Sequence, residues 1–201
     1  MDDPLLRTRA TYDVIAGQFL ENARERGTLE LWLDRFAADL SPGALALDLG
    51  AGPGMDTAAL RQRGLRAVGL DFSRGMLRAG VREFPAPRVQ GDARRLPFGD
   101  GVFAGVWASA SLLHLADADA RCALGEARRI LRPAGVLYVS VKAGTGTEIE
   151  STRYGLPRFF QYWSADALDG VLHSAGFDVL ERVTSDLPRA TWLARLARRR
   201  P

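Results

Sequence analysis

The stretch "ALALDLGAGPGMDT" (residues 44–57) decides the fold. An apolar run reaches an acid at Asp48, three glycines follow at alternate positions from Gly50 to Gly54, and a helical pattern begins at Met55. This order predicts a buried strand, a tight loop and a helix, which together are the repeating unit of a doubly wound sheet. Ligands of such sheets bind at the carboxyl ends of the strands, so we expect the glycine loop to line a binding crevice.

The rest of the chain alternates apolar strands with amphipathic helices. Two helical stripes fall within residues 1–40, and a later helix is expected to stop at Pro133. The pattern predicts an α/β fold: a doubly wound, Rossmann-like, seven-stranded and mostly parallel sheet with an antiparallel terminal strand and helices on both faces. The expected strands span residues 44–50, 65–71, 88–92, 101–109, 135–142, 177–183 and 191–200.

Length and composition predict a single domain over residues 1–201. A chain of 201 residues and 21.9 kDa can bury one sizeable core but is short for two ordinary domains. Its longest apolar runs are strand-sized, so we expect no membrane partner. The N-terminus shows no secretory pattern, which predicts a cytoplasmic protein.

The charged and thiol groups add few functional signals. The net charge is +3. Its two clusters, Arg94–Arg95 and the tail from Arg195, are predicted to be a solvated face and a frayed tail, because no nucleic-acid recognition motif accompanies them. Nucleic acid is therefore disfavoured as a partner. The single cysteine, Cys122, can form no internal disulfide, and its alanine-rich helical surroundings predict a packing role.

The spacing of the glycines restricts the ligand. A dinucleotide fingerprint reads G-x-G-x-x-G, whereas here the third glycine comes one residue early and Met55 stands in its place. This spacing disfavours NAD. It suits a ligand without phosphates, because the glycines allow a ribose or an amino-acid group to approach the backbone closely.

Further polar groups follow the next strands. Asp71 ends the second strand, where a carboxylate can accept both ribose hydroxyls. Asp92 can accept a hydrogen bond from an exocyclic amine, and the Ala93 amide can serve a ring nitrogen. Phe72 and Met76 offer apolar faces for a flat base. These strand ends therefore converge on a site shaped for an adenosine.

Together the motifs resemble those of the class I S-adenosylmethionine-dependent methyltransferases, in the small-molecule subgroup that consists of little beyond the core domain. The resemblance is carried, in family order, by "LDLGAGPG" (47–54), "VGLDFSRGML" (68–77), "GDARRLPF" (91–98), "VWASASLLHL" (106–115) and "ILRPAGVLYVSVK" (130–142). The flanks "YDVIAGQF" (12–19) and residues 158–181 match as well. One departure is Ala134, where the family usually has a glycine.

The resemblance implies S-adenosyl-L-methionine as cofactor, S-adenosyl-L-homocysteine as product, and no metal. It places Asp48 and the glycine loop at the methionine part of the cofactor. The alternatives are a purely structural role for Asp48, core packing for Tyr12 and a helix-dipole role for Asp56. The implied cofactor residues are Tyr12, Asp48, Gly50, Ala51, Gly52, Gly54, Asp56, Asp71, Phe72, Met76, Asp92, Ala93, Ala108 and Ser109.

The chain divides into N-terminal helices over the cofactor (1–40), a cofactor-binding core (44–142), a lid (143–163) and a C-terminal helix with two strands (164–201). The lid has no clean period, and a segment of that length without one is more often functional than idle. Its aromatic residues can equally be core. The predicted substrate residues are Tyr154, Arg158, Phe159 and Trp163.

The predicted function is methyl transfer to a small-molecule acceptor by in-line displacement. Such a reaction needs alignment, and it needs a base only when the nucleophile carries a proton. His114 follows the fourth strand and is the candidate base, with a structural or substrate-packing role as the alternative. Two other functions stay open: a non-catalytic S-adenosylmethionine-binding regulatory or partner protein, and an RNA or protein methyltransferase. The sequence does not identify the acceptor.

Overall fold

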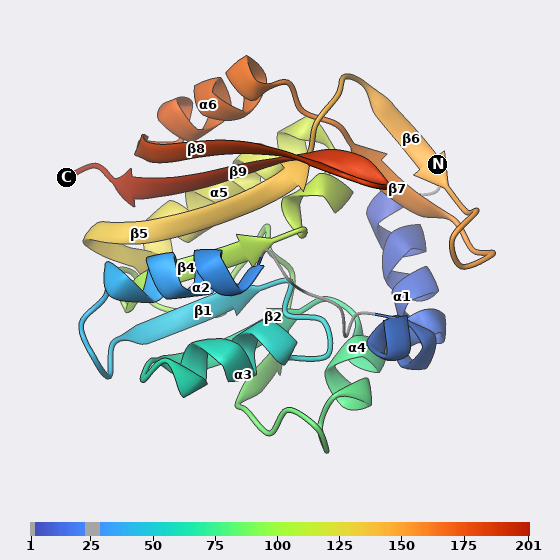
Figure 1. Ribbon diagram of the computed structural model, residues 1–201, viewed down its shortest axis with the longest axis horizontal. Helices are drawn as coiled ribbons and strands as arrows, with labels where there is room; N and C mark the ends of the chain where they lie inside the picture. The colour runs from blue at the N-terminus through green and yellow to red at the C-terminus, as the bar shows by residue number, and fades with distance from the viewer. Residues whose placement is uncertain (1–2, 23–28) are drawn as a thin grey trace.

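The computed structural model describes residues 3–22 and 29–201 and shows an α/β domain built around one large sheet (Figure 1). The seven strands of this sheet have the order β3-β2-β1-β4-β5-β9-β8, which confirms the predicted fold class. They are β1 (Leu45–Leu49), β2 (Arg66–Asp71), β3 (Arg88–Gln90), β4 (Phe103–Ser109), β5 (Leu131–Lys142), β8 (Phe177–Leu187) and β9 (Ala190–Arg199).

The strand order reverses beside β1. From β1 the chain moves outward through β2 to β3 and then returns to place β4 on the other side of β1. Strands β1 to β5 are parallel, whereas β9 runs antiparallel between β5 and β8. A crevice outside the carboxyl ends of β1 and β4 follows from this reversal, because the connections after the two strands leave in opposite directions.

Helices cover both faces of the sheet (Figure 1). They are α1 (Pro4–Asn22), α2 (Leu29–Ala38), α3 (Met55–Gln62), α4 (Arg74–Ala79), α5 (Asp117–Ile130) and α6 (Ala165–Ser174), with a short 3-10 turn, η1 (Leu112–His114). Phe36 of α2 and Leu60 of α3 are buried in one core cluster with Trp107 of β4. Leu124 of α5 and Leu172 of α6 belong to a second core cluster. Burial on both faces is the physical reason for the continuous apolar strands.

Helix α1 lies at the end of the sheet toward which the parallel strands point (Figure 1). Its Asp13 carboxylate accepts hydrogen bonds from the Ser73 hydroxyl (2.7 Å) and the Gly75 amide (2.8 Å) at the start of α4. Two other α1 side chains, Thr8 and Thr11, are buried. The helix is therefore fixed to the sheet through α4, and its threonines are available for a contact elsewhere.

That contact comes from a hairpin within residues 143–163, where the sequence showed no regular period. Strands β6 (Thr147–Glu150) and β7 (Arg158–Gln161) pair antiparallel as a separate two-stranded sheet. The Phe159 amide donates to Thr8 Oγ1 (2.9 Å), and Thr11 Oγ1 donates to the Pro157 carbonyl (2.6 Å). The hairpin is thus joined to α1 by buried hydrogen bonds.

Helix α5 ends at Ile130, three residues before Pro133, in line with the predicted stop, and β5 begins at the next residue. Two local predictions were wrong. Cys122 is exposed, because the stripe of α5 that faces the sheet passes on either side of it. Arg195 is not in a frayed tail: it is buried on β9 and forms an ion pair with Asp169 of α6.

Two further observations concern the described residues as a whole. Ala134, where the resembled family usually has a glycine, has a left-handed backbone with φ of 58°. In residues 3–22 and 29–201, the structure contains no helix with the length and apolar character needed to cross a membrane.

Candidate functional site

A cavity lies at the point where the strand order reverses. Its walls come from α1, the glycine loop after β1, the residues that follow β2 and β3, and the turn after β4. The predicted cofactor residues that line it are Tyr12, Gly50, Ala51, Gly52, Asp56, Asp71, Phe72, Met76, Asp92, Ala93 and Ser109, and the candidate base His114 lines it too.

Asp71 organises the loops on both sides of the cavity. Its carboxylate accepts hydrogen bonds from the Gly52 amide (2.8 Å) and the Ser73 amide (2.7 Å). Burial raises the pKa of Asp71 to about 6, although these amide hydrogen bonds oppose the rise. At neutral pH the side chain is therefore a carboxylate that can accept further hydrogen bonds from a ligand.

The glycine loop is closely packed against the turn after β4. The Gly50 and Ala51 amides donate to the Leu70 carbonyl at 2.8 and 2.9 Å, which fixes the loop against β2. Gly50 has φ of +80°, and a Cβ atom placed there would lie 2.3 Å from Ser111 Cβ. Only glycine can therefore occupy position 50 without displacing the turn.

Asp92 lies at the opposite end of the cavity wall, after β3. It accepts a hydrogen bond from the Arg94 amide (2.9 Å), and its Oδ2 atom lies 2.7 Å from the Arg94 guanidinium. Burial acts to raise the pKa of Asp92, but Arg94 outweighs it and holds the pKa below its ordinary value. The group is therefore ionised at neutral pH.

Asp56 has a partner in the core as well as a place on the cavity wall. Its carboxylate accepts a hydrogen bond from Trp107 Nε1 (3.0 Å), and both side chains are buried. The Trp107 ring in turn stacks on Tyr138 with 3.9 Å between ring centroids. This arrangement connects the first turn of α3 to the centre of the sheet.

Asp48, Gly54 and Ala108, although predicted to contact the cofactor, are not among the cavity-lining residues. Asp48 is buried at the end of β1 and accepts a 2.6 Å hydrogen bond from Thr57 Oγ1 on α3. Gly54 precedes α3 with a left-handed backbone, and Ala108 is buried within β4. All three are buried, and their contact with the cofactor stays a prediction.

Tyr12 and His114 meet inside the cavity. Tyr12 Oη lies 2.7 Å from His114 Nε2, and His114 Nδ1 lies 2.7 Å from the Phe159 carbonyl oxygen. Burial lowers the pKa of His114 to about 3, with Arg158 and Lys142 acting in the same direction. Burial disfavours the charged form of Tyr12 too, and it raises the pKa of Tyr12 to about 12. Both groups are therefore neutral at physiological pH.

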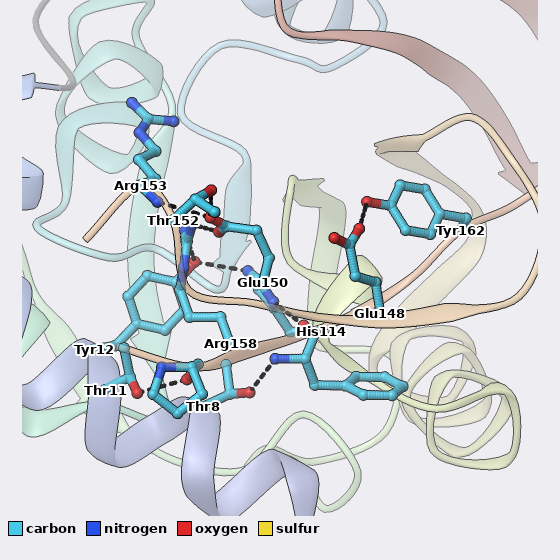
Figure 2. A network of polar contacts seen from close by, with 12 residues as sticks. Thr8, Thr11, Tyr12, His114, Glu148, Glu150, Thr152, Arg153, Arg158 and Tyr162 are labelled. Atoms are coloured by element: carbon cyan, nitrogen blue, oxygen red, sulfur yellow. Dashed lines mark hydrogen bonds and ion pairs between the residues drawn. The ribbon is translucent and has the colours of Figure 1, made fainter. Parts of the chain in front are cut away.

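The four predicted substrate residues lie behind this pair and do not line the cavity: Tyr154, Arg158, Phe159 and Trp163. Arg158 forms an ion pair with Glu150 and donates a 3.4 Å hydrogen bond to Tyr12 Oη (Figure 2). Phe159 and Trp163 are buried core residues. The hairpin thus buttresses Tyr12 and His114 from the side away from the cavity.

Sequence reasoning missed most of the α1 contribution to the cavity. Leu5, Arg9 and Phe19 line it beside Tyr12. Leu5, Arg9 and Tyr12 follow one another at intervals of four and three residues, so one helical face carries all three. That spacing was a usable signal. Ser111, which also lines the cavity, had no comparable signal because it lies in an irregular turn.

The polar groups of the cavity fit a nucleoside without phosphates. Arg9 Nε and Ser111 Oγ are buried and have no hydrogen-bond partner, so the cavity offers unpaired polar atoms to a ligand. Among the described lining residues, Arg9 is the only cationic one, which is a poor match for a pyrophosphate. No group of three or more metal-ligating side chains in the described parts of the chain could hold a metal ion.

Comparison with known proteins agrees with this geometry. A family model described as a methyltransferase domain matches residues 47–139. A demethylmenaquinone methyltransferase of Mycobacterium tuberculosis is 46% identical over 105 residues, which cover 52% of this chain and 44% of that protein. Both matches agree with the resemblance of residues 47–139 to the class I S-adenosylmethionine-dependent methyltransferases. The chain spans about half the length of the curated relatives that it matches.

Solved structures of other proteins share the fold of this chain. The 1,6-didemethyltoxoflavin-N1-methyltransferase of Burkholderia thailandensis, solved with S-adenosylhomocysteine, has a TM-score of 0.73 and 21% identity, covering 100% of this chain and 92% of that one. A chain from the complex of the Haloferax volcanii Trm112 methyltransferase activator with a putative methyltransferase has a TM-score of 0.80 and 23% identity, with coverages of 96% and 98%. At such identities the likeness concerns the fold alone.

Proposed function

We propose that this chain transfers the methyl group of S-adenosylmethionine to a small-molecule acceptor by in-line displacement. The observation that carries the proposal is the cavity at the strand reversal, where Asp71, Asp92 and the glycine loop converge. Two buried polar atoms of its lining residues have no hydrogen-bond partner within the protein. The methyltransferase match over residues 47–139 covers the same loops. Relatives named for demethylmenaquinone support a small-molecule acceptor.

The cofactor would supply a methyl group activated by a sulfonium. Asp71 would accept the ribose hydroxyls, because its carboxylate lies on the cavity wall and is ionised above a pH of about 6. Asp92 and the Ala93 amide would bind the base edge, with Phe72 and Met76 as its apolar neighbours. Alignment of two bound reactants is the main contribution such a site can make.

The proposed proton acceptor is His114, and the proposed acceptor site is the part of the cavity beside it. His114 lines the cavity in the turn after β4, and the hairpin contacts it through Phe159. The pKa of His114, lowered to about 3 by burial, leaves its imidazole unprotonated at neutral pH. A base is required only if the acceptor atom carries a proton.

Incubation with S-adenosylmethionine labelled in its methyl group tests the proposal. The acceptors are a panel of phenols, quinols, carboxylic acids and amines, with RNA and total protein as separate arms, and label transfer is measured after chromatography. We expect transfer to a small molecule, lost in Asp71→Ala. Binding of the cofactor without transfer in any arm would favour the non-catalytic alternative, and transfer only to RNA or protein would contradict the small-molecule acceptor.

A further inference from the structure

Both ring nitrogens of His114 are already engaged within the protein. A backbone carbonyl can only accept, so the 2.7 Å contact with the Phe159 oxygen requires a proton on His114 Nδ1. In the neutral ring Nε2 then carries a lone pair, and the Tyr12 hydroxyl 2.7 Å away must donate to it. No ring nitrogen is therefore left to receive a proton from an acceptor molecule directly.

Tyr12 has the free capacity that His114 lacks. Its oxygen gives its proton to His114 and receives a 3.4 Å hydrogen bond from Arg158, which leaves one lone pair unused. Tyr12 also lines the cavity. We propose that Tyr12 takes the acceptor's proton while passing its own to His114, so that the site serves acceptors whose nucleophilic atom bears a proton, such as a hydroxyl group.

This inference rests on the methyl-transfer function proposed above, and the step balances as follows. The bond between the acceptor atom and its hydrogen breaks, and that proton moves to Tyr12 Oη as the Tyr12 proton moves to His114 Nε2. The methyl–sulfur bond breaks with its electron pair left on sulfur, and the acceptor atom gains the methyl group. His114 is then an imidazolium, and it returns its proton to water through Tyr12 after the product leaves.

The charges around the pair allow only a short-lived imidazolium on His114. Arg158 of β7 lies beside Tyr12, with its guanidinium carbon 5.8 Å from the ring centroid, and Glu150 of β6 neutralises it. Lys142 of β5 lies over Phe160, whose ring is 4.7 Å from that of His114. These cations disfavour the imidazolium. The sulfonium loses its charge in the same step, so the net charge of the site does not rise.

Figure 2 shows how this arrangement is held. Arg158 reaches from the hairpin to Tyr12 on α1, and Thr8 and Thr11 of the same helix also face the hairpin (Figure 2). The hairpin thereby fixes the Tyr12 oxygen and, through the Phe159 carbonyl, the tautomer of His114. Arg158 is in this sense a positioning residue, because it acts through Tyr12.

Nitrogen NMR of the histidine side chains tests the starting state without any acceptor. The chain has two histidines, and the exposed His173 provides an internal reference. With S-adenosylhomocysteine bound, we expect His114 to carry its proton on Nδ1 from pH 5 to 8, with an Nε2 signal that shifts in Tyr12→Phe. A proton on Nε2, or titration of His114 within that range, would overturn the relay whatever the fate of the methyl-transfer proposal.

Single-turnover methyl transfer to the acceptor found in the label-transfer screen tests the step itself. Tyr12→Phe should lower the rate at least ~100-fold, the range that general acid–base groups supply. His114→Asn should do the same, because its amide can still donate to the Phe159 carbonyl while the Nε2 acceptor is gone. Tyr162→Phe is the matched control, since the Tyr162 hydroxyl bonds to Glu148 outside the cavity.

The outcomes separate the two proposals. If Tyr12→Phe keeps more than about a tenth of the wild-type rate, the acceptor reaches His114 directly and the relay is wrong, although methyl transfer stands. If the wild-type protein binds S-adenosylmethionine but methylates nothing, the function proposal fails, and the NMR result still decides the state of Tyr12 and His114. Cofactor-induced stabilisation of each variant shows whether it has folded.

Discussion

The cavity wall and the hairpin both carry charged groups, but they use them differently. On the cavity wall, Asp71 is held by amides only two and nineteen residues away in sequence, and its carboxylate still faces the cavity. In the hairpin, Arg158 forms an ion pair with Glu150 and a hydrogen bond with Tyr12, which lies 146 residues away. The charge of Asp71 therefore faces the space where a ligand would bind, whereas the charge of Arg158 is paired within the protein.

This difference makes a general prediction about variants. Changes on the cavity wall should lower the affinity for the cofactor, and changes in the hairpin should lower stability or turnover while leaving the cofactor affinity nearly intact. Gly50 is the exception. It lies on the cavity wall, but a substitution there should lower stability because the residue packs closely against Ser111.

The largest effect is expected from Gly50→Ala. The new Cβ would clash with Ser111 and the residue would be strained at φ of +80°, so we expect a loss of ~3 kcal/mol or more in unfolding free energy. Gly43→Ala is the matched control, because Gly43 has a similar φ of +76° with open space around it, and ~1 kcal/mol is expected there. Urea denaturation measures both losses. Equal losses in the two variants would contradict the close packing of Gly50 against Ser111.

Arg158→Met should lower the unfolding free energy by about 3 kcal/mol, because it leaves the Glu150 carboxylate without its buried ionic partner. S-adenosylhomocysteine affinity, measured by calorimetry, should change by less than about threefold, since Arg158 does not line the cavity. Arg121→Met removes an exposed ion pair on α5 and should leave the unfolding free energy nearly unchanged. A large loss of cofactor affinity in Arg158→Met would contradict the claim that the hairpin does not take part in cofactor binding.

Asp71→Asn should weaken S-adenosylhomocysteine binding by about 10- to 100-fold, because charge-assisted hydrogen bonds to the ribose become neutral ones. The asparagine keeps the shape of the site and one acceptor oxygen. Asp100→Asn removes the same charge at a side chain that is 80% exposed and should leave the affinity unchanged. Calorimetric titration distinguishes the two, and unchanged binding in Asp71→Asn would place the ribose elsewhere.

The pH dependence of cofactor binding should follow Asp71. Its pKa, raised to about 6 in the free protein by burial, means that protonation competes with ribose binding below pH 6. The affinity for S-adenosylhomocysteine should therefore be constant above about pH 7 and fall by up to about tenfold for each pH unit below 6. In Asp71→Asn the slope should vanish. An affinity that stays constant down to pH 5 in the wild-type protein would contradict this role.

The sequence predicted the cavity better than the hairpin for a physical reason. Asp71 and Asp92 follow strands, and parallel strands end at one edge of a sheet, so their meeting can be deduced from local pattern alone. The bond between Tyr12 and His114 spans 102 residues and depends on the angle at which α1 crosses the sheet. No local periodicity encodes that angle.

The same limit applies elsewhere in the chain. The residues between 143 and 163 alternate too weakly to predict strands, and β7, which pairs with β6, is held by hydrogen bonds that Thr8 and Thr11 of α1 make with Phe159 and Pro157 from outside the segment. Asp48 was predicted to face the cofactor from its position in the motif. Its 2.6 Å hydrogen bond to Thr57 depends on the packing of α3 against β1, which the motif does not specify.

The most direct test of the central claim is the melting temperature of the wild-type protein with each candidate cofactor. S-adenosylhomocysteine at 100 times its dissociation constant should add ~2.7 kcal/mol to the stability and raise the melting temperature by several degrees. NAD at the same concentration should not change it, because Arg9 is the only cationic side chain among the described residues that line the cavity, which is a poor match for a pyrophosphate. Stabilisation by NAD and none by S-adenosylhomocysteine would contradict the account.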